Sequence, residues 1–391
     1  MSVKQFEKKK TIVHLVTPYL FHTGSWVYSQ LTGIRKYDNI VFTQRLQNLD
    51  LFPFDPVVSP NQFSSLQQIK NSAYFKLTER YSPLLLEKLK QAKPNLIHAH
   101  FGFEAYRWLS MIYSLKLPLI TTFYGVDVSH YGKIPKWKKR YEKLFDYGTL
   151  FLAEGSYLKH QLEELGCSNQ KIIVQHLGVN INSYPQKDFK AEQHSSKVII
   201  LQVSTFREKK GLEYSLNAYK KVLSTFPNTE FRIIGGGDNK VATDKIINLA
   251  KSLNVQSNVK FLGIKSHSET LFEMKNADIF LHPSVTASNG DNEGGAPVSV
   301  IEASAIGLPI ISTYHADIPE VVIDGKTGYL SPERDTDSLS EKICLLVKDV
   351  DLRRQFGMNG IQHITTHYNL SLQIQKLEEL YGSVIGNGKK E

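Results

Sequence analysis

The stretch KVIILQVSTFREKKGLEYSLNAYKKV (197–222) joins a run of β-branched residues to a basic loop and a segment with helical apolar spacing. The run is apolar on both faces, which is typical of a strand buried between helices in a parallel sheet. Comparable runs, each followed by a loop and a helix-length segment, include TIVHLVT (11–17), LIHAH (96–100) and ADIFLHPS (277–284). This alternation predicts an α/β protein with parallel sheets covered by helices.

The length of the chain indicates two domains. A chain of 391 residues is too long for one ordinary core. The segment NINSYPQKDFKAEQHSSK (180–197) is polar, contains a proline and separates two series of predicted strands. We therefore predict a Rossmann-like domain over 1–185, a second one over 196–370, and a C-terminal helix and tail over 371–391 that packs back on the first domain.

The composition indicates a soluble protein of a reducing compartment. Only two cysteines, Cys167 and Cys344, are present, which offers neither a disulfide framework nor a zinc site. The first residues lack the apolar core and cleavage site of a signal peptide. The apolar stretches are interrupted before the length of about 18 residues that a membrane span requires. We expect a cytoplasmic protein.

Positive charge is concentrated in the first half of the chain. Residues 1–190 contain 25 Lys and Arg against 14 Asp and Glu, whereas the remainder contains 22 against 24. This asymmetry indicates an anionic partner, such as a phospholipid surface or a phosphorylated molecule. No nucleic-acid motif is present, so nucleic acid is not an expected partner. The run YGKIPKWKKRYEKLF (131–145) interleaves basic and aromatic residues, which fits either an interfacial helix on an anionic membrane or a solvated basic helix.

The segment PSVTASNGDNEGGAPVSVIEASAIGLPIIST (283–313) carries the clearest candidate binding site. Pro297 suits the first position of a helix, in which Val298, Ile301 and Ala305 recur as one buried face. The carboxylate of Glu302 lies in this apolar stretch, where it requires hydrogen-bond donors such as the two hydroxyls of a ribose. Before the helix, the glycines at 294–295 permit close backbone approach, and the helix start at Pro297 and Val298, after Ala296, offers free N–H groups that suit an anion. An internal salt bridge is the alternative role for an isolated glutamate.

Basic residues also follow the strand that begins at residue 197. Arg207, Lys209 and Lys210 occupy the turn between this strand and the next helix, where cations and free N–H groups suit a diphosphate.

These segments together resemble glycosyltransferase family 4, whose GT-B fold has two Rossmann-like domains with parallel sheets facing across a cleft. The resemblance covers residues 11–370. It implies that Glu293 faces the donor sugar and Glu302 the nucleotide ribose, although they are nine residues apart here and usually eight. It also implies that Lys210 and Arg207 contact the diphosphate, although Thr205 occupies the usual arginine position. The turn around Gly263 and Lys265 would lie near the nucleobase.

The first half resembles the same family at three loops. In LVTPYLFHTGSWVYSQL (15–31), Gly24 would allow close approach of the donor diphosphate. In TTFYGVDVS (121–129), Tyr124 stands where many members have a histidine close to the transferred sugar, and it can still donate a hydrogen bond. Asp127 matches an aspartate on the acceptor side. In HAHFG (98–102), two histidines share one strand face, but we expect no metal site without a third ligand.

The resemblance implies a retaining, metal-independent transferase. The donor would be a nucleotide diphosphate sugar, with UDP ahead of GDP, and the acceptor a saccharide or a polyprenyl-diphosphate-linked saccharide in polysaccharide synthesis. Catalysis would rest on Glu293, Lys210, Tyr124 and Asp127, with the enzyme in the cytoplasm or on the inner membrane face. Two alternatives remain open, namely a nucleotide-sugar-binding partner subunit and a nucleotide-sugar epimerase of related fold.

Overall fold

The computed structural model describes residues 9–21, 24–189 and 197–387. The chain divides into two compact units, residues 1–178 together with 370–391, and residues 179–369. The boundary predicted from the sequence is later, between 185 and 196. Val179 already belongs to the second unit because its N–H donates to the carbonyl of Tyr368 at 2.8 Å, and Lys187 N–H donates to Ile306 O at 3.0 Å.

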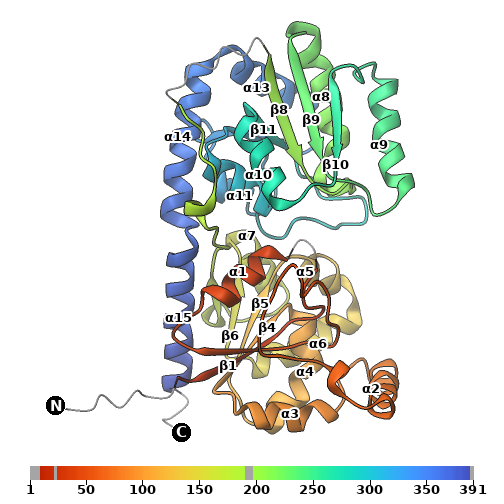
Figure 1. Cartoon of the computed structure of the whole chain (residues 1–391), viewed down its shortest axis with the longest axis vertical. Helices are drawn as coiled ribbons and strands as arrows, with labels where there is room; N and C mark the ends of the chain where they lie inside the picture. Colours follow the sequence, from red (N-terminus) through yellow and green to blue (C-terminus); the bar gives the residue numbers. More distant parts are fainter. Residues whose placement is uncertain (1–8, 22–23, 190–196, 388–391) are drawn as a thin grey trace, which may run out of the picture. The chain divides into compact units, whose positions relative to one another are not determined.

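The first unit contains a parallel seven-stranded sheet in the order β3-β2-β1-β4-β5-β6-β7. Figure 1 labels β1, β4, β5 and β6 of this sheet. Its strands are β1 (Thr11–Leu15), β2 (Asp38–Phe42), β3 (Val57–Val58), β4 (Leu96–His100), β5 (Leu119–Phe123), β6 (Leu150–Ala153) and β7 (Ile172–Val174). The strand order reverses between β1 and β4. Loops at the carboxyl ends of these two strands therefore form the position where such sheets bind ligands.

Helices cover both faces of this sheet. They are α1 (Ser25–Gly33), α2 (Ser65–Thr78), α3 (Leu84–Ala92), α4 (Gly102–Ser114), α5 (Val126–Ser129), α6 (Pro135–Tyr147), α7 (Ser156–Glu164) and α15 (Leu370–Asn387). Val13 and Ile97 point into one core with Trp108 of α4. Their neighbours Ile12 and Leu96 point to the other face, as the two-residue period of a strand requires.

The C-terminal helix α15 completes the second of these two cores. Ile374, Leu377 and Tyr381 pack against the face that contains Ile12 and Leu96. The Glu378 carboxylate accepts hydrogen bonds from the backbone N–H groups of Arg35 and Lys36, each at 2.8 Å. Residues far apart in the sequence thus form one sheet face and its cover (Figure 1).

Helix α6 does not have the surface role that its basic and aromatic residues suggested. Trp137 and Tyr141 are 6% and 0% exposed and belong to the core of the first unit. Arg140 bonds Glu79 at 2.6 Å and Lys136 bonds the same carboxylate at 2.7 Å. An interfacial helix would need its aromatic face outward, so Trp137 and Tyr141 do not supply the membrane contact that we considered for this run.

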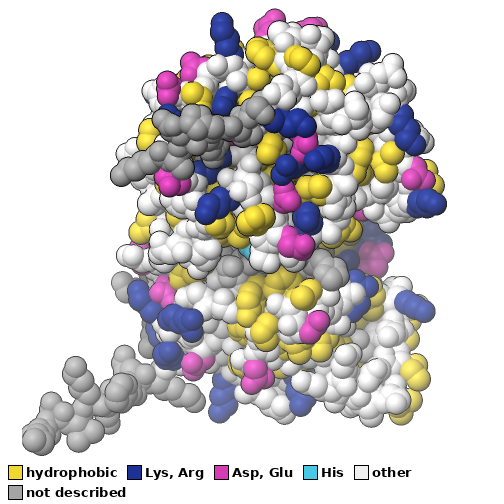
Figure 2. All heavy atoms as spheres, turned by 45° about the horizontal axis from the view of Figure 1, so that its top comes forward, with side chains coloured by type: hydrophobic (Ala, Val, Ile, Leu, Met, Phe, Trp, Pro, Cys, Tyr) yellow, Lys and Arg dark blue, Asp and Glu magenta, His cyan; other side chains and the backbone are white. Residues whose placement is uncertain are grey.

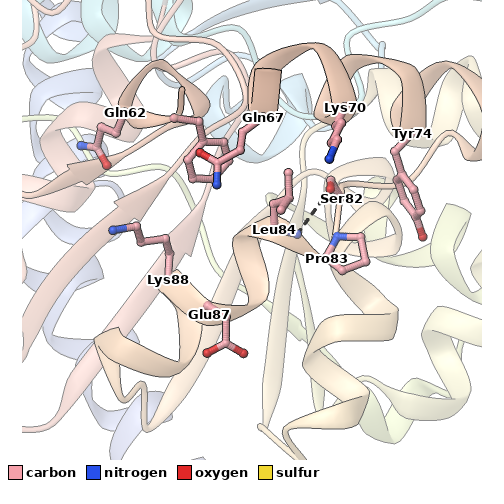
Figure 3. A pocket seen from close by; sticks show the side chains of 10 residues that line it. Gln62, Gln67, Lys70, Tyr74, Ser82, Pro83, Leu84, Glu87 and Lys88 are labelled. Carbon is pink, nitrogen blue, oxygen red and sulfur yellow. Dashed lines mark hydrogen bonds between the residues drawn. The ribbon is translucent and has the colours of Figure 1, made fainter. Parts of the chain in front are cut away.

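Helix α2 has the exposed apolar side chains that α6 lacks. Leu66, Ile69 and Leu77 are 62%, 66% and 87% exposed. A groove of about 720 Å³ separates α2 from α3 and is lined by Lys70 and Lys88 among others (Figure 3). On the face shown in Figure 2, basic and acidic side chains are interspersed, so no broad surface of one charge is visible there.

The second unit contains a parallel six-stranded sheet in the order β10-β9-β8-β11-β12-β13. Its strands are β8 (Val198–Val203), β9 (Thr229–Ile234), β10 (Val259–Gly263), β11 (Ile279–His282), β12 (Ile310–Thr313) and β13 (Gly328–Ser331). Its helices are α8 (Leu212–Thr225), α9 (Lys240–Ser252), α10 (His267–Asn276), α11 (Val298–Ile306), α12 (Ile318–Val321), α13 (Thr336–Lys348) and α14 (Val350–His367). Here the strand order reverses between β8 and β11, which again marks the expected ligand position. Within the described residues of the chain, we find no helix with the length and hydropathy of a membrane span.

Helix α11 differs in two ways from its predicted form. It begins at Val298, with Pro297 as the N-cap residue. Val298 is only partly buried, whereas every residue from Val300 to Ile306 is buried. The helix is therefore enclosed rather than buried along one face, because α10 and α14 also pack against it.

Candidate active site

A part-buried ion pair lies at the reversal point of the second sheet. Lys210 ends a short turn, η5 (Glu208–Lys210), that follows β8, and its Nζ lies 2.7 Å from Oε2 of Glu293. The Glu293 side chain is 6% exposed, and its Oε1 accepts from Ser284 Oγ at 2.9 Å. Burial alone would raise the pKa of Glu293, but the positive charge of Lys210 holds it well below its usual value. The carboxylate is thus kept ionised and facing a cation.

The loops that carry this ion pair touch each other directly. Gly211 follows Lys210 with φ +66°, and a Cβ there would lie 1.8 Å from the carbonyl oxygen of Pro283. Only glycine allows the loop after β8 to approach the loop after β11 this closely.

Two residues that the sequence analysis missed hold the backbone of Glu293. The Glu293 N–H donates to His315 Nε2 at 3.2 Å, so Nδ1 of that ring carries the hydrogen and donates to Glu333 at 2.6 Å. His315 follows β12 and Glu333 follows β13. Both are polar residues directly after buried strands, and this position in the sequence could have identified them as candidate site residues.

His282 is a third residue that the sequence analysis missed. It ends β11 with its side chain fully buried, and its Nε2 lies 3.8 Å from Glu293, which is too long for a hydrogen bond. Neither ring nitrogen has a hydrogen-bond partner among the described residues. Burial lowers the pKa of His282, so the ring is neutral beside the carboxylate.

The other two cations of the β8 loop have separate partners. Lys209 Nζ donates to the carbonyl of Asn292 at 2.8 Å and pairs with Asp291 at 3.2 Å. Arg207 forms an exposed pair with Asp238 at 3.1 Å. Of the three basic residues in this loop, Lys210 alone bonds Glu293.

Glu302 lies in α11 with 7% of its surface exposed. Its Oε1 accepts two hydrogen bonds, from His267 Nε2 at 2.8 Å and from the Tyr184 hydroxyl at 3.1 Å. Its Oε2 has no hydrogen-bond partner among the described residues. The bond to Glu302 raises the pKa of His267. One carboxylate oxygen is thus held internally, and the other remains an acceptor.

The remaining predicted donor residues flank these groups. Gly294 has φ +76°, and its N–H donates to the side chain of Asn292 at 3.0 Å. Gly295 and Ala296 are buried between it and α11. Gly263 ends β10 with φ +69° and no atom within 4 Å of an added Cβ. Lys265 lies 3.7 Å from Glu269.

In the first unit, Asp127 holds two loops together. Its side chain is fully buried, and its oxygens accept from the N–H groups of Gly102 at 3.0 Å and Tyr124 at 3.1 Å. Burial raises the pKa of Asp127 to about 6, although these donors act against the shift. Asp127 therefore joins the loops after β4 and β5 as a positioning residue. Gly24 caps α1, and a Cβ there would lie 2.9 Å from Phe21 O, so its own turn requires glycine.

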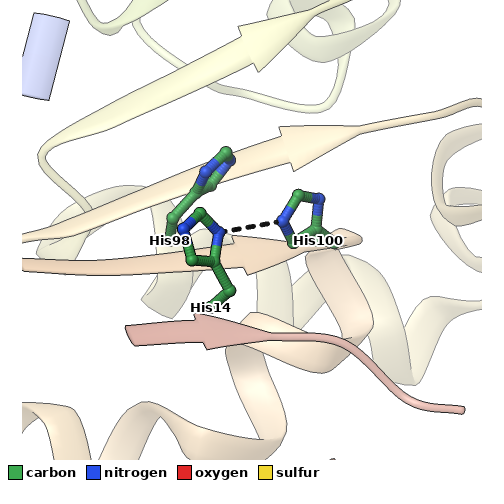
Figure 4. A group of neighbouring side chains, drawn as sticks. All are labelled: His14, His98 and His100. Atoms are coloured by element: carbon green, nitrogen blue, oxygen red, sulfur yellow. Dashed lines mark hydrogen bonds between the residues drawn. The ribbon is translucent and has the colours of Figure 1, made fainter. Parts of the chain in front are cut away.

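Three buried histidines meet beside these loops (Figure 4). Their possible ligand atoms all lie within 4.8 Å of one another, and His14 of β1 is the third histidine that the sequence analysis did not find beside His98 and His100. All six ring nitrogens have hydrogen-bond partners. Besides the 3.3 Å contact between His14 and His100, these are the side chains of Asn39, Tyr381, Thr122 and Tyr124. The cluster is satisfied as a neutral hydrogen-bond network.

Comparisons with known proteins agree across both halves of the chain. The family described as Glycosyltransferase Family 4 matches residues 37–183, and the family described as Glycosyl transferases group 1 matches residues 184–363. The amylovoran biosynthesis glycosyltransferase AmsK of Erwinia amylovora is 33% identical over 306 residues, 76% of this chain and 74% of that protein. The putative colanic acid biosynthesis glycosyltransferase WcaL of Escherichia coli K12 is 32% identical over 58% of this chain. That match spans only about half, 54%, of WcaL.

Solved structures agree with the fold. HepE from Anabaena, solved with UDP, has a TM-score of 0.78 at 16% identity, covering 96% of this chain and all of that one. A glycosyltransferase from Rickettsia africae has a TM-score of 0.76 at 19% identity, covering 97% of this chain and all of that one. With the two parallel sheets, these likenesses confirm the predicted GT-B class of α/β fold.

Proposed function

Because this chain belongs to glycosyltransferase family 4, we propose that it moves a sugar from a nucleotide diphosphate sugar to a saccharide or lipid-linked saccharide in polysaccharide synthesis. The names of its relatives support this role, since they concern colanic acid, amylovoran and, in Staphylococcus aureus, capsular polysaccharide. The observation that carries the proposal is the part-buried Lys210–Glu293 pair at the reversal point of the second sheet.

We assign each donor-binding role to a side chain whose polar group can bond to the donor. Glu302 offers Oε2 to the ribose hydroxyls while Tyr184 and His267 hold Oε1. Lys210 turns from Glu293 toward the diphosphate when the donor binds. UDP is the favoured nucleotide, because solved proteins of the same fold are described in complex with UDP.

The chemistry proposed is electrostatic and needs no metal. Negative charge grows on the diphosphate as the glycosidic bond breaks, and a cation already positioned there stabilises it in the transition state. The acceptor hydroxyl attacks from the face that the diphosphate leaves, so the anomeric configuration is retained. The departing phosphate takes the proton of the acceptor hydroxyl.

A donor screen tests this function. Calorimetric titration with UDP-glucose, UDP-galactose, UDP-N-acetylglucosamine, GDP-mannose and ADP-glucose identifies the donor, with Glu302→Gln as the matched control. The bound donor is then incubated with polyprenyl-diphosphate-linked saccharides. Transfer of sugar supports the proposal. Binding without transfer would indicate a partner subunit, and an isomerised donor would indicate an epimerase.

The same proposal places the enzyme in the cytoplasm, with its first unit against an anionic membrane. Leu66, Ile69 and Leu77 of α2 supply the apolar contact, and exposed Lys70 and Lys76 on the same helix supply the positive charge. Each such lysine contributes about 1 kcal/mol near an anionic surface, so attachment is reversible and salt-dependent.

Sedimentation with vesicles containing anionic lipid tests this attachment. The variant with Leu66, Ile69 and Leu77 changed to Ser should stay in the supernatant at low salt, whereas the wild type pellets. A control with Lys138→Gln and Lys139→Gln on α6 removes charge elsewhere and should still pellet. Equal pelleting of all three proteins, or none by the wild type, would refute the attachment through α2.

A further inference from the structure

The histidine cluster of the first unit forms a hydrogen-bond chain that ends at Tyr124. His14 lies on β1 and His100 on β4, next to the point where the strand order reverses. His14 Nδ1 lies 3.3 Å from His100 Nε2, and His100 Nδ1 lies 2.7 Å from the Tyr124 hydroxyl (Figure 4 shows the first of these contacts). The chain therefore leads from inside the sheet to the loop after β5.

Asn39 fixes the direction of this chain at its inner end. Its Nδ2 donates to the carbonyl oxygens of Ile34 at 3.1 Å and Tyr37 at 3.4 Å. Its Oδ1 consequently faces His14 Nε2, 3.2 Å away. An amide oxygen only accepts, so the hydrogen of this bond belongs to His14 Nε2.

The positions of the other hydrogens in this chain follow from the hydrogen on His14 Nε2. A neutral His14 with its hydrogen on Nε2 has a bare Nδ1, which must accept from His100 Nε2. His100 then has a bare Nδ1, which must accept from the Tyr124 hydroxyl. Burial lowers the pKa of His14 to about 4, despite its bond with Asn39, and lowers that of His100 well below its usual value. Both rings are therefore neutral at pH 7.

We propose that Asn39, His14 and His100 are positioning residues that commit the Tyr124 hydroxyl hydrogen to His100, so that this hydroxyl, on a side chain that is 9% exposed, has no hydrogen to donate to a sugar. The sugar as ligand rests on the proposed function. The ring of Tyr124 is held in place by Trp26 and Phe101, whose ring centroids lie 4.2 and 4.8 Å away. Tyr124 can thus offer a ligand only its hydroxyl oxygen as an acceptor, whereas the residue type alone led us to expect that the tyrosine could donate.

The positions of the ring hydrogens can be measured on the full-length protein without any ligand. Long-range ¹H–¹⁵N NMR correlation distinguishes protonated from bare ring nitrogens, and His14→Gln and His100→Gln assign the two rings among the 13 histidines. At pH 7 we expect hydrogen on Nε2 and none on Nδ1 in both rings. Hydrogen on Nδ1 of either ring would overturn the proposal, as would an equimolar bound metal found by elemental analysis of the purified protein.

A double-mutant cycle tests whether His100 acts through Tyr124. Turnover is measured as nucleotide release from UDP-glucose, UDP-galactose, UDP-N-acetylglucosamine and GDP-mannose. Tyr124→Phe and His100→Leu should each lower kcat about tenfold, which corresponds to the free energy of one hydrogen bond. The double variant should lower kcat no further than either single variant. His100→Asn, whose amide oxygen can accept from Tyr124, should recover most of the loss.

The two proposals fail in different ways. Additive effects of Tyr124→Phe and His100→Leu would show that His100 does not act through Tyr124, whatever the donor. Absence of turnover in the wild type would contradict the proposed function, while the NMR pattern still decides the direction of the hydrogen-bond chain.

Discussion

The two sheets present different chemistry at the points where their strand order reverses. In the first unit the three histidine rings bond only to one another and to uncharged side chains. In the second unit Lys210 pairs with Glu293, and Lys209 pairs with Asp291 in the same loops. A neutral network can set the direction of a hydrogen bond. In an ionic cluster, by contrast, a charged side chain can leave its internal partner and pair with a charged ligand.

This difference predicts how strongly each region responds to substitution. Removing one partner of a buried ion pair leaves an uncompensated charge, which costs about 3–5 kcal/mol. Removing one partner of a neutral hydrogen bond leaves an unsatisfied group, which costs about 1–3 kcal/mol. Substitutions in the second unit should therefore have the larger effects.

The largest effect is expected for Lys210→Ala. Loss of the cation should lower kcat about 100-fold or more, because charge on the leaving diphosphate is no longer stabilised. It should also lower the free energy of unfolding by about 3 kcal/mol, because Glu293 loses its partner. Lys209→Ala, which removes the pair with Asp291, should reduce kcat far less. Steady-state kinetics and urea unfolding measure both quantities, and equal kcat losses for the two lysines would contradict this distinction.

The combined variant Lys210→Ala and Glu293→Gln separates stability from catalysis. Neutralising the carboxylate should recover much of the lost stability, while kcat stays low. Recovery of both the free energy of unfolding and kcat would show that Lys210 acts only by neutralising the charge of Glu293.

Glu302→Gln should reduce affinity for UDP about tenfold or more, since hydrogen bonds to a charged group are worth about 1.5–3 kcal/mol. Calorimetry with UDP alone measures this loss. Tyr184→Phe removes only a neighbour of Oε1 and should weaken binding less. An unchanged affinity of Glu302→Gln for UDP would contradict the assignment of Glu302 to the ribose hydroxyls.

In the neutral region, Tyr381→Phe removes the partner of His98 Nδ1, 2.6 Å away in the wild type. The free energy of unfolding should fall by about 1–3 kcal/mol, measured by thermal unfolding together with circular dichroism. UDP affinity should not change, because the nucleotide is assigned to the second unit. Tyr37→Phe, at a less buried bond to α15, is the matched control and should cost less. A loss of UDP affinity in Tyr381→Phe would contradict this separation of roles.

The smallest effect is a pH dependence at His267. Its pKa is raised above 6.5 by Glu302, so the charged pair is complete below pH 6.5 and is lost as pH rises through the higher folded value. The Tm difference between wild type and His267→Gln should therefore shrink with rising pH. The His267 side chain is 52% exposed, so solvent screens the pair and it contributes less than about 1 kcal/mol. A Tm difference between the two proteins that grows with pH would contradict a raised pKa of His267.

The fold class and the second-unit loops were predictable because their signals are local. Buried strands appear as continuous apolar runs, and Glu302 stood out as a single charge in an apolar helix. The pairing of distant strands has no such signal. His14 lies directly opposite His98 in the register between β1 and β4, which the sequence of either strand does not contain. His315 and Glu333 were missed for the same reason, because they reach Glu293 from other strand ends.

The burial of the aromatic residues of α6 was not predicted, for a different reason. Trp137 and Tyr141 are four residues apart and share one helix face, which was considered as a membrane face or as part of a solvated helix. An apolar face of a helix in an α/β protein is more often covered by the sheet and its neighbouring helices, as it is here.

The return of α15 to the first unit has a consequence for synthesis on the ribosome. Arg35 and Glu378, which join this helix to the first unit, are 343 residues apart. The second unit is contiguous and can fold as soon as it emerges, but the face containing Ile12 and Leu96 stays bare until α15 has been translated. A nascent chain that stops before Leu370 keeps this apolar face open to chaperones and proteases. Helix α15 thereby makes translation through its own residues a condition for a closed first unit.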